Sequence, residues 1–221
     1  MIGSLSYGSG GETSLHPRRN RALPAKLPIE QESDGHLAAW RLADALREKN
    51  PAAAIGEFKA LAQQGSYMSM LTLGWLYLTG TGTPVDLAES ERWFKRVAET
   101  GSVRAHYYLA ATLLRAKHDA AAILALEYAV ARGHSPSMVR LGGMYQVGRS
   151  IERDLSKAHQ LYERAAERGN IFGKARLANL YLRKYKGLRM KLKGARLMAS
   201  AMIEGASLVL KKQDNDIRLQ H

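Results

Sequence analysis

The chain has 221 residues, which is enough for one ordinary hydrophobic core or one extended array. It contains no cysteine, which excludes disulfides and thiolate metal sites and fits a reducing compartment. The formal net charge of +13 favours acidic partners, namely nucleic acid, an anionic membrane surface or an acidic protein. A basic surface that only aids solubility would give the same total. No apolar run reaches the roughly 18–20 residues of a membrane span.

The start of the chain is rich in glycine, serine, proline and charge, so residues 1–35 are predicted to form a disordered basic tail. This tail lacks the apolar segment that follows the basic start of a secretory signal. Residues 36–46 are then expected to form a single helix that covers the start of a stack. A partial repeat supports this, because "REKNPAAAI" (47–55) matches "RAKHDAAAI" (115–123) at a shift of 68.

Five similar phrases, each ending in a glycine, recur along the rest of the chain. Their glycines are Gly65, Gly101, Gly133, Gly169 and Gly205, at spacings of 36, 32, 36 and 36 residues. Eleven, seven and three residues before each glycine stand a small, a large apolar and another apolar residue, as in Ala158, Tyr162 and Ala166. Steps of four place these side chains on one face of a helix. The pattern predicts a helix that ends at the glycine, where the left-handed conformation terminates it.

A second helix is predicted after each of the first four glycines. Its mark is a phrase such as "LGWLY" or "LANLY", which begins eight residues after the glycine, at Leu73, Leu109, Leu141 and Leu177. Ser66, Ser102 and Ser135 are placed to cap these second helices, and Asp86 and Asp154 to cap two of the first ones. One helix pair cannot bury its apolar face alone, so the pairs must stack.

The whole pattern therefore predicts an all-α fold. Every periodic segment has a step near 3.6 residues, so we expect about ten or eleven helices in antiparallel pairs and no sheet. The pairs form an α-solenoid over residues 36–213, and residues 214–221 are predicted to be a flexible C-terminal tail.

The motif residues resemble the Sel1-like repeats, a branch of the tetratricopeptide-like helical solenoids. Residues 80–101 carry Gly80, Gly82, Asp86, Trp93, Phe94, Ala98 and Gly101 of the family phrase. Residues 153–181 carry Asp154, Lys157, Ala158, Tyr162, Ala165, Ala166, Gly169, Ala175, Leu177 and Tyr181. The resemblance implies a right-handed solenoid that acts as an adaptor holding other proteins together. Several family members sit in membrane-linked assemblies, including protein-degradation and exopolysaccharide machinery.

The chain departs from the family phrase in three places. The repeat that ends at Gly133 lacks the Gly-x-Gly turn, and the repeat that ends at Gly205 has "YKGLRMKLK" in its place. Many secreted members carry paired cysteines, which are absent here. The resemblance therefore points to the cytoplasm, with or without association with a membrane complex.

The sequence offers no pattern typical of an enzyme, a metal site or a cofactor site. None of the 7 histidines belongs to an H-E-x-x-H pair. His159 and Glu163 are four residues apart on a predicted helix, a spacing that favours an exposed pair over a metal site. The glycines of residues 80–84 follow a helix rather than a strand and lack a phosphate-loop lysine. We expect no catalysis, no metal and no cofactor.

The aromatic residues divide into two groups. Those at repeat positions are expected in the core: Trp75, Trp93, Tyr145, Tyr162 and Tyr181. Tyr107, Tyr108 and Tyr128 have no clear repeat position. They are candidates for the inner surface of the solenoid, where aromatic side chains anchor bound segments.

The C-terminal part of the chain contains a basic block. Residues 174–196 carry nine lysines and arginines and no acid, so these charges are either solvated or meet an acidic partner. The candidate partner-binding residues are Arg183, Lys184, Lys186, Arg189, Lys191 and Lys193. A solvated end of the solenoid, an acidic protein partner, and nucleic acid or anionic lipid are the alternatives.

These observations lead to two hypotheses of different class. The first is a non-enzymatic scaffold that binds a partner protein through the solenoid groove and the basic C-terminal surface. The second is an electrostatic binder of nucleic acid or of an anionic membrane surface. Binding driven by phosphate contacts weakens steeply with salt, whereas a groove with apolar anchors loses much less.

Overall fold

The structure is a computed structural model that describes residues 33–183 and 187–218. Within these residues it consists of ten helices and no strand: α1 (Asp34–Lys49), α2 (Pro51–Gln63), α3 (Tyr67–Thr79), α4 (Leu87–Ala98), α5 (Val103–Arg115), α6 (Asp119–Ala131), α7 (Ser135–Val147), α8 (Leu155–Glu167), α9 (Ile171–Arg183) and α10 (Leu188–Arg218). The predicted tail up to residue 32 lies outside the described residues, as do Lys184 and Lys186.

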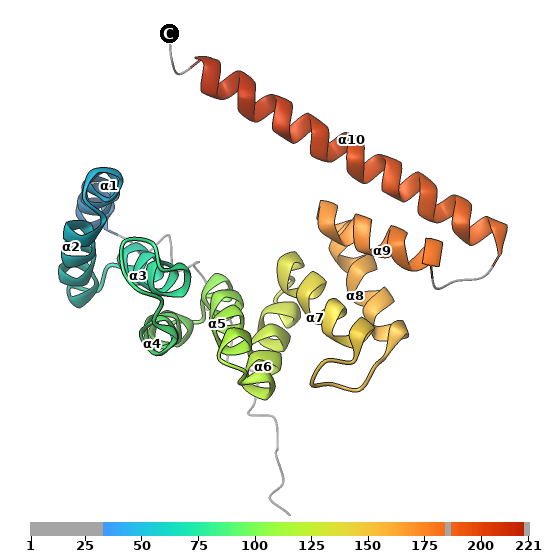
Figure 1. Cartoon of the computed structure of the whole chain (residues 1–221), viewed down its shortest axis with the longest axis horizontal. Helices are drawn as coiled ribbons and strands as arrows, with labels where there is room; N and C mark the ends of the chain where they lie inside the picture. Colours follow the sequence, from blue (N-terminus) through green and yellow to red (C-terminus); the bar gives the residue numbers. More distant parts are fainter. Residues whose placement is uncertain (1–32, 184–186, 219–221) are drawn as a thin grey trace, which may run out of the picture.

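Each helix packs against the next one along the chain, from α1 on α2 to α9 on α10. Further contacts join alternate helices of the odd-numbered set: α1 with α3, α3 with α5, and α7 with α9. Alternate helices come closest on the inner side of a curved stack, so the odd-numbered helices form that side. Figure 1 shows the arc from α1 to α9, with α4 and α6 on its outer side. The all-α solenoid predicted from the sequence is confirmed.

The first four repeat glycines end their helices as predicted. Gly65, Gly101, Gly133 and Gly169 follow α2, α4, α6 and α8, and all have positive φ, between 75° and 96°. The prediction for Gly205 was wrong, because this residue lies inside α10. No second apolar phrase follows Gly205, so residues 206–218 do not form a separate helix that packs back on α10. The helix therefore continues to Arg218. Residues 214–218, expected in a flexible tail, are therefore helical.

Most predicted caps are present. The side chains of Ser66 and Ser102 accept backbone N–H bonds at the starts of α3 and α5, and Asp86 and Asp154 do so at α4 and α8. Ser135 is not a cap, because α7 already begins at this residue. The N-cap is His134, which directly follows Gly133 as Ser66 and Ser102 follow their glycines, and its Nδ1 lies 2.8 Å from the Ser137 hydroxyl.

The core follows the predicted stripe of small and large residues. The large residues Phe58, Phe94, Leu126 and Tyr162 and the small residues Ala54, Ser90, Ala122 and Ala158 are all fully buried. The large rings fit because the facing helix carries a glycine. A Cβ on Gly74 would lie 2.8 Å from the Phe94 ring, and a Cβ on Gly142 would lie 2.7 Å from the Tyr162 ring.

In α10 the register of the buried face differs from the prediction. The sequence pattern placed Gly194, Met198 and Met202 on the stripe, but Met202 is 69% exposed. Gly194 and Ala201 are buried, and Met190 and Leu197 pack against the core cluster that contains Tyr181. The difference arises because α10 packs mainly on α9, and no other described helix covers its opposite face.

Candidate partner-binding groove

The inner face of the solenoid is lined by side chains that stand three and seven residues after each terminal glycine. Three residues after stand Met68, Arg104, Pro136 and Phe172, and seven residues after stand Thr72, Tyr108, Arg140 and Arg176. These residues line two clefts along the odd-numbered helices. We call the two clefts together the inner groove.

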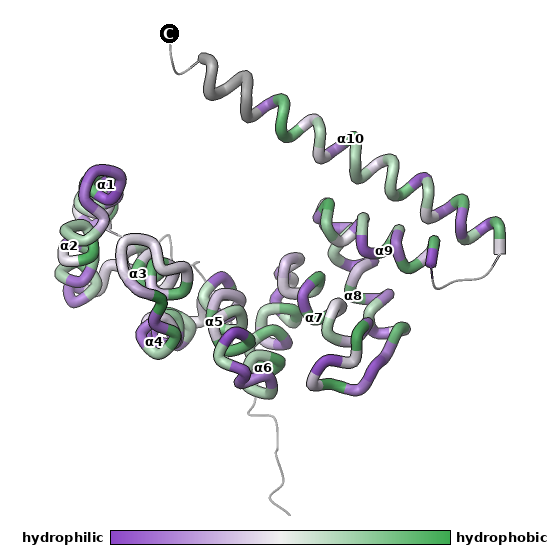
Figure 2. The backbone as a smooth tube through the Cα atoms, viewed as in Figure 1, coloured by the Kyte–Doolittle hydropathy of each residue, from purple (hydrophilic) through white to green (hydrophobic). Residues whose placement is uncertain are grey.

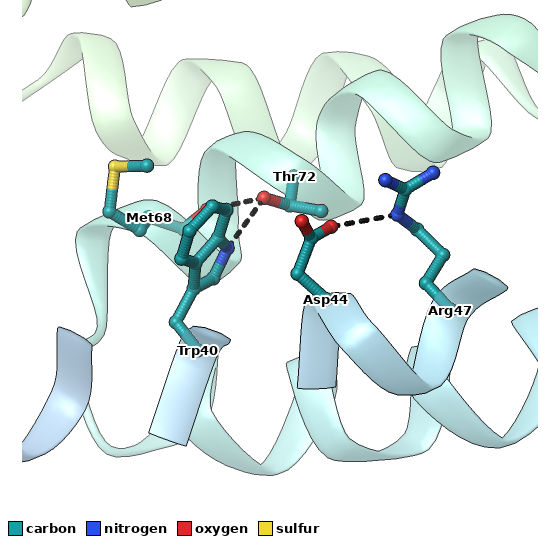
Figure 3. A network of polar contacts seen from close by, with 5 residues as sticks. All are labelled: Trp40, Asp44, Arg47, Met68 and Thr72. Atoms are coloured by element: carbon teal, nitrogen blue, oxygen red, sulfur yellow. Dashed lines mark hydrogen bonds and ion pairs between the residues drawn. The ribbon is translucent and has the colours of Figure 1, made fainter. Parts of the chain in front are cut away.

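The N-terminal cleft of the inner groove lies between α1, α3 and α5. The Trp40 Nε1 donates a hydrogen bond of 2.9 Å to the Thr72 hydroxyl, which in turn donates to the Met68 carbonyl. Beside it the Arg47 guanidinium bonds to the Asp44 carboxylate at 2.8 Å (Figure 3). The Asp44 and Arg47 charges of this cleft therefore balance each other, whereas Arg104, which also lines it, has no such partner among the described residues.

Trp75 lies in the same cleft, although the sequence placed it in the core. It is 40% exposed, so that prediction was wrong. Helix α3 buries Leu73, Leu76 and Tyr77 against neighbouring helices. The Trp75 side chain lies on a different face of α3, which lines the cleft. Of the other aromatics expected in the core, Trp93, Tyr162 and Tyr181 are buried and Tyr145 is partly buried.

The C-terminal cleft of the inner groove lies between α5, α7 and α9 and has a volume of about 720 Å³. Its rim carries two strongly exposed apolar side chains, Phe172 at 75% and Val147 at 74%. Its floor includes Tyr107, with the Arg140 guanidinium 5.3 Å from the centre of the Tyr107 ring. Apolar side chains and cations thus stand side by side in one cleft.

Three arginines on successive inner helices give the groove its charge. Arg104, Arg140 and Arg176 form no ion pair with any described residue. The only carboxylate that lines either cleft is Asp44, which already bonds to Arg47. Burial lowers the pKa of His134, and the nearby Arg104 charge lowers it further. The inner groove therefore presents positive charge without internal neutralisation.

The structure places the three candidate tyrosines differently. Tyr107 lines the C-terminal cleft and Tyr108 the N-terminal one, and Tyr108 also stacks on Phe94 with ring centres 5.3 Å apart. Tyr128 belongs to α6, outside the lining of both clefts. Its ring stacks on His106 at 3.7 Å and lies under the Arg132 guanidinium at 3.4 Å.

The described part of the basic block lies where α9 meets α10. Arg183 ends α9, and Arg189, Lys191 and Lys193 begin α10, all of them exposed. The Lys193 amine donates a hydrogen bond of 2.9 Å to the Tyr181 hydroxyl, and this bond raises the pKa of Lys193. We call Arg183, Arg189, Lys191, Lys193 and Arg196 the basic corner.

The sequence pattern did not single out Arg140, Val147, Phe172 and Arg176 as groove residues. The signal lay in the repeat itself. The positions three and seven residues after each glycine vary between aromatic, apolar and charged residues, whereas the core positions stay apolar or small. A variable position on a fixed helical face is typical of a surface that recognises a partner.

Neither a metal site nor a membrane span was found among the described residues. No group of three His, Asp or Glu side chains there could hold a metal ion. The His159 Nδ1 lies 3.9 Å from the Glu163 carboxylate, and its Nε2 lies 2.9 Å from the Tyr181 hydroxyl. Of the helices in the described part, none is both long and apolar enough to span a bilayer.

Comparison with known proteins identifies the repeats. The family model described as "Sel1 repeat" matches residues 68–102 and 135–170. An uncharacterized protein of Neisseria meningitidis serogroup B, NMB1327, is 33% identical over 124 residues, which are 54% of this chain and 26% of the relative. This chain therefore spans about a quarter of the relative's length.

Two solved structures share the fold. One is c5321, a protective antigen of uropathogenic Escherichia coli with an SLR fold: 24% identity, a TM-score of 0.63, and 78% of this chain and 39% of c5321 covered. The other is a Sel1 repeat protein from Oxalobacter formigenes: 24% identity, a TM-score of 0.63, and 76% of each chain covered. At this identity the likeness concerns the fold alone.

Proposed function

Residues 68–102 and 135–170 match the Sel1 repeat, and Sel1-repeat proteins generally mediate protein–protein interaction. We therefore propose that this chain is a non-enzymatic adaptor that holds an acidic segment of a partner protein in the inner groove. The observation that carries the proposal is the C-terminal cleft, where unpaired arginines stand beside exposed apolar side chains. Solvation alone would explain the arginines but not Phe172 and Val147, whose exposure costs free energy unless a partner covers them.

The cleft supports a segment that presents carboxylates and an apolar side chain together. Arg140 and Arg176 belong to adjacent inner helices, α7 and α9, and both line the cleft. Guanidinium groups bind carboxylates through paired hydrogen bonds. An apolar side chain of the same segment would pack against Phe172 and Val147 at the rim. The groove thus combines affinity from apolar contact with selection for acidic residues.

The basic corner supports a second contribution. Its exposed cations lie at the end of the inner face, where they would attract an acidic partner over a distance of about a Debye length. This contribution raises the rate of association rather than the lifetime of the complex. We place the adaptor in the cytoplasm, either free or within a membrane-linked assembly such as exopolysaccharide machinery.

The test begins with affinity capture of the partner from the native cell, followed by titration of its purified binding segment. Arg140→Glu with Arg176→Glu should weaken the segment's affinity about tenfold or more, since each change replaces attraction by repulsion. The matched control is Arg41→Glu with Arg164→Glu, which makes the same charge change at exposed positions outside the groove. The control should bind like the wild type at moderate salt.

Salt separates this proposal from the alternative of nucleic-acid or anionic-surface binding. A groove with apolar anchors keeps most of its affinity between low and high salt. Binding that neutralises phosphates falls steeply and linearly on a logarithmic plot. Such a slope, or equal losses in the groove variant and in its control, would contradict the groove proposal.

A further inference from the structure

One face of α10 carries a continuous apolar stripe that stays exposed. The stripe consists of Leu188, Leu192, Ala195, Ala199, Met202, Ala206 and Val209. Its large members are 52% to 74% exposed. Figure 1 shows the C-terminal part of α10 apart from the other helices, and Figure 2 shows hydrophobic positions continuing along it. The stripe therefore has no partner among the described residues.

The spacing of the stripe is that of a coiled coil. Its steps are four, three, four, three, four and three residues, so the seven positions make three and a half heptads. Sustained over about three to four heptads, apolar residues at such positions indicate a coiled-coil seam. At 1.5 Å per residue the stripe is roughly 33 Å long.

The opposite face of α10 already holds the helix to the solenoid. Met190 and Leu197 pack against the Tyr181 cluster, and a Cβ on Gly194 would lie 2.9 Å from the Ala178 carbonyl. On the same side the Lys174 amine pairs with the Glu204 carboxylate. The stripe is thus a second apolar face of α10, and the first face packs against the solenoid.

We propose that the stripe is a self-association surface, on which the α10 helices of two copies of this chain pack antiparallel as a short coiled coil. A two-fold axis near Ala199 would relate the copies, so that the same surface serves both, as in most homodimers. The solenoids would then lie on opposite sides of the paired helices, because each packs on the α10 face opposite its stripe. The inner grooves would stay open, since the stripe belongs to neither cleft.

The area of the stripe fits a stable dimer. Six large apolar side chains lie on the stripe or directly beside it: Leu188, Leu192, Met202, Ile203, Val209 and Leu210, all more than half exposed. Burying six such side chains from each copy removes on the order of 1,000 Å² from water. This area is at the lower limit of about 1,000 Å² that a specific interface needs. The alanines at three seam positions let the two backbones approach closely.

The charges beside the stripe favour the antiparallel direction. Its flanks carry Arg189, Lys191 and Arg196 in the first third and the apolar Ile203 and Leu210 further on. The one acid within residues 188–210 is Glu204, which is paired with Lys174. A parallel pair would set the three cations of each copy against those of the other. In an antiparallel pair, the three cations of one copy face the apolar C-terminal flank of the other copy. The aliphatic stems of the cations can pack on that flank.

Light scattering coupled to size exclusion tests the proposal on the full chain. We expect twice the monomer mass over a concentration series for the wild type, and the monomer mass for Leu192→Glu with Met202→Glu. The matched control is Leu208→Glu, an exposed leucine on the face that carries Met190 and Ala201, and it should remain dimeric. Circular dichroism and the melting midpoint establish that each variant is folded. A wild type that is monomeric at every concentration would overturn the proposal.

Cysteine crosslinking tests the direction, because the chain has no cysteine of its own. Ala199→Cys, near the proposed axis, should crosslink to itself with a short bis-maleimide. Leu188→Cys alone should not, because its two copies would lie about 30 Å apart. An equimolar mixture of Leu188→Cys and Val209→Cys should give the mixed dimer. Self-crosslinking of Leu188→Cys would show a parallel pair and contradict the proposed arrangement.

A basic amphipathic helix can also bind an anionic membrane through its apolar face. Vesicle flotation distinguishes membrane binding from dimer formation. If the wild type is monomeric, floats with phosphatidylserine vesicles, and loses flotation with Leu192→Glu and Met202→Glu, the stripe faces lipid and the dimer proposal is wrong. Failure of the groove variants to affect partner binding would leave the dimer intact, so the two proposals fail separately.

Discussion

The Tyr162 ring lies directly against the backbone of Gly142, so close that a Cβ on that glycine would be 2.7 Å from a ring carbon. Phe94 of α4 and Gly74 of α3 have the same relationship two helix pairs earlier, at 2.8 Å. In both cases a large ring on the first helix of one repeat occupies the space that a glycine on the neighbouring odd-numbered helix leaves open.

Gly142→Ala should therefore destabilise the protein by about 1–3 kcal/mol, because the added methyl group overpacks a fully buried ring. The ordinary helix preference would predict the opposite sign, since alanine exceeds glycine by roughly 0.5–1 kcal/mol inside a helix. Chemical denaturation of both proteins measures the difference. Gly143→Ala is the control: a Cβ there would lie 3.7 Å from the Tyr162 hydroxyl, and stability should stay equal or rise.

Gly169→Ala and Gly205→Ala should change stability in opposite directions. Gly169 has a φ of +75° and ends α8, so alanine there is strained by about 1–2 kcal/mol, although nothing lies within 4 Å of the new Cβ. Gly205 is helical with the same open space, so alanine there should stabilise by roughly 0.5–1 kcal/mol. Equal changes in stability at both positions would contradict the prediction that the positive φ of Gly169 determines the effect.

The stability of the folded chain should fall as the pH drops below about 6.5, the ordinary pKa of histidine. Burial lowers the pKa of both His106 and His134, so the folded state takes up protons less readily than the unfolded one. Their contribution is fully present above the unfolded pKa and declines until the pH passes the lowered folded values. In urea titrations at several pH values, the double variant His106→Asn with His134→Asn should show a flatter profile over this window.

Four cations of the basic block, between the end of α9 and the start of α10, should act on association and hardly at all on folding. Reversing Arg183, Lys184, Lys186 and Arg189 to glutamate should change the melting midpoint little, because the described members are exposed. If an acidic partner uses this surface, its association should slow markedly, with most of the loss at low salt. Stopped-flow mixing with the captured partner measures the rate. Normal association by a folded variant would exclude these four cations and leave the inner groove as the binding surface.

The helix pairs and their ends follow from the sequence because they depend on local rules. A stripe in steps of four, a capping serine or aspartate and a terminating glycine each act within a few residues, and Gly133 and Gly169 behave accordingly. Gly205 has the same stripe before it but no apolar phrase after it. Its helix continues because termination also requires a following segment that packs back.

The groove could be predicted only in part. Tyr107 and Tyr108 were candidates and line it, whereas Trp75 shares the spacing of the core residues and yet points to the inner face. Whether a helical side chain faces the neighbouring repeat or the groove depends on the rotation of its helix in the stack. That rotation is set by contacts with neighbouring helices, such as those of Ser90 with Gly74, 16 residues away, and with Thr112, 22 residues away.

The buried apolar side chains of the described residues form three clusters along the chain rather than one common core. Nearly all packing joins helices adjacent in sequence, so one end of the chain can open while the other stays folded. Hydrogen exchange should therefore proceed in segments, with the amides of α9 and α10 exchanging together and separately from those of α3 and α4. A partner bound in the C-terminal cleft would contact α5, α7 and α9 at once. Its binding should therefore slow amide hydrogen exchange in two neighbouring clusters together.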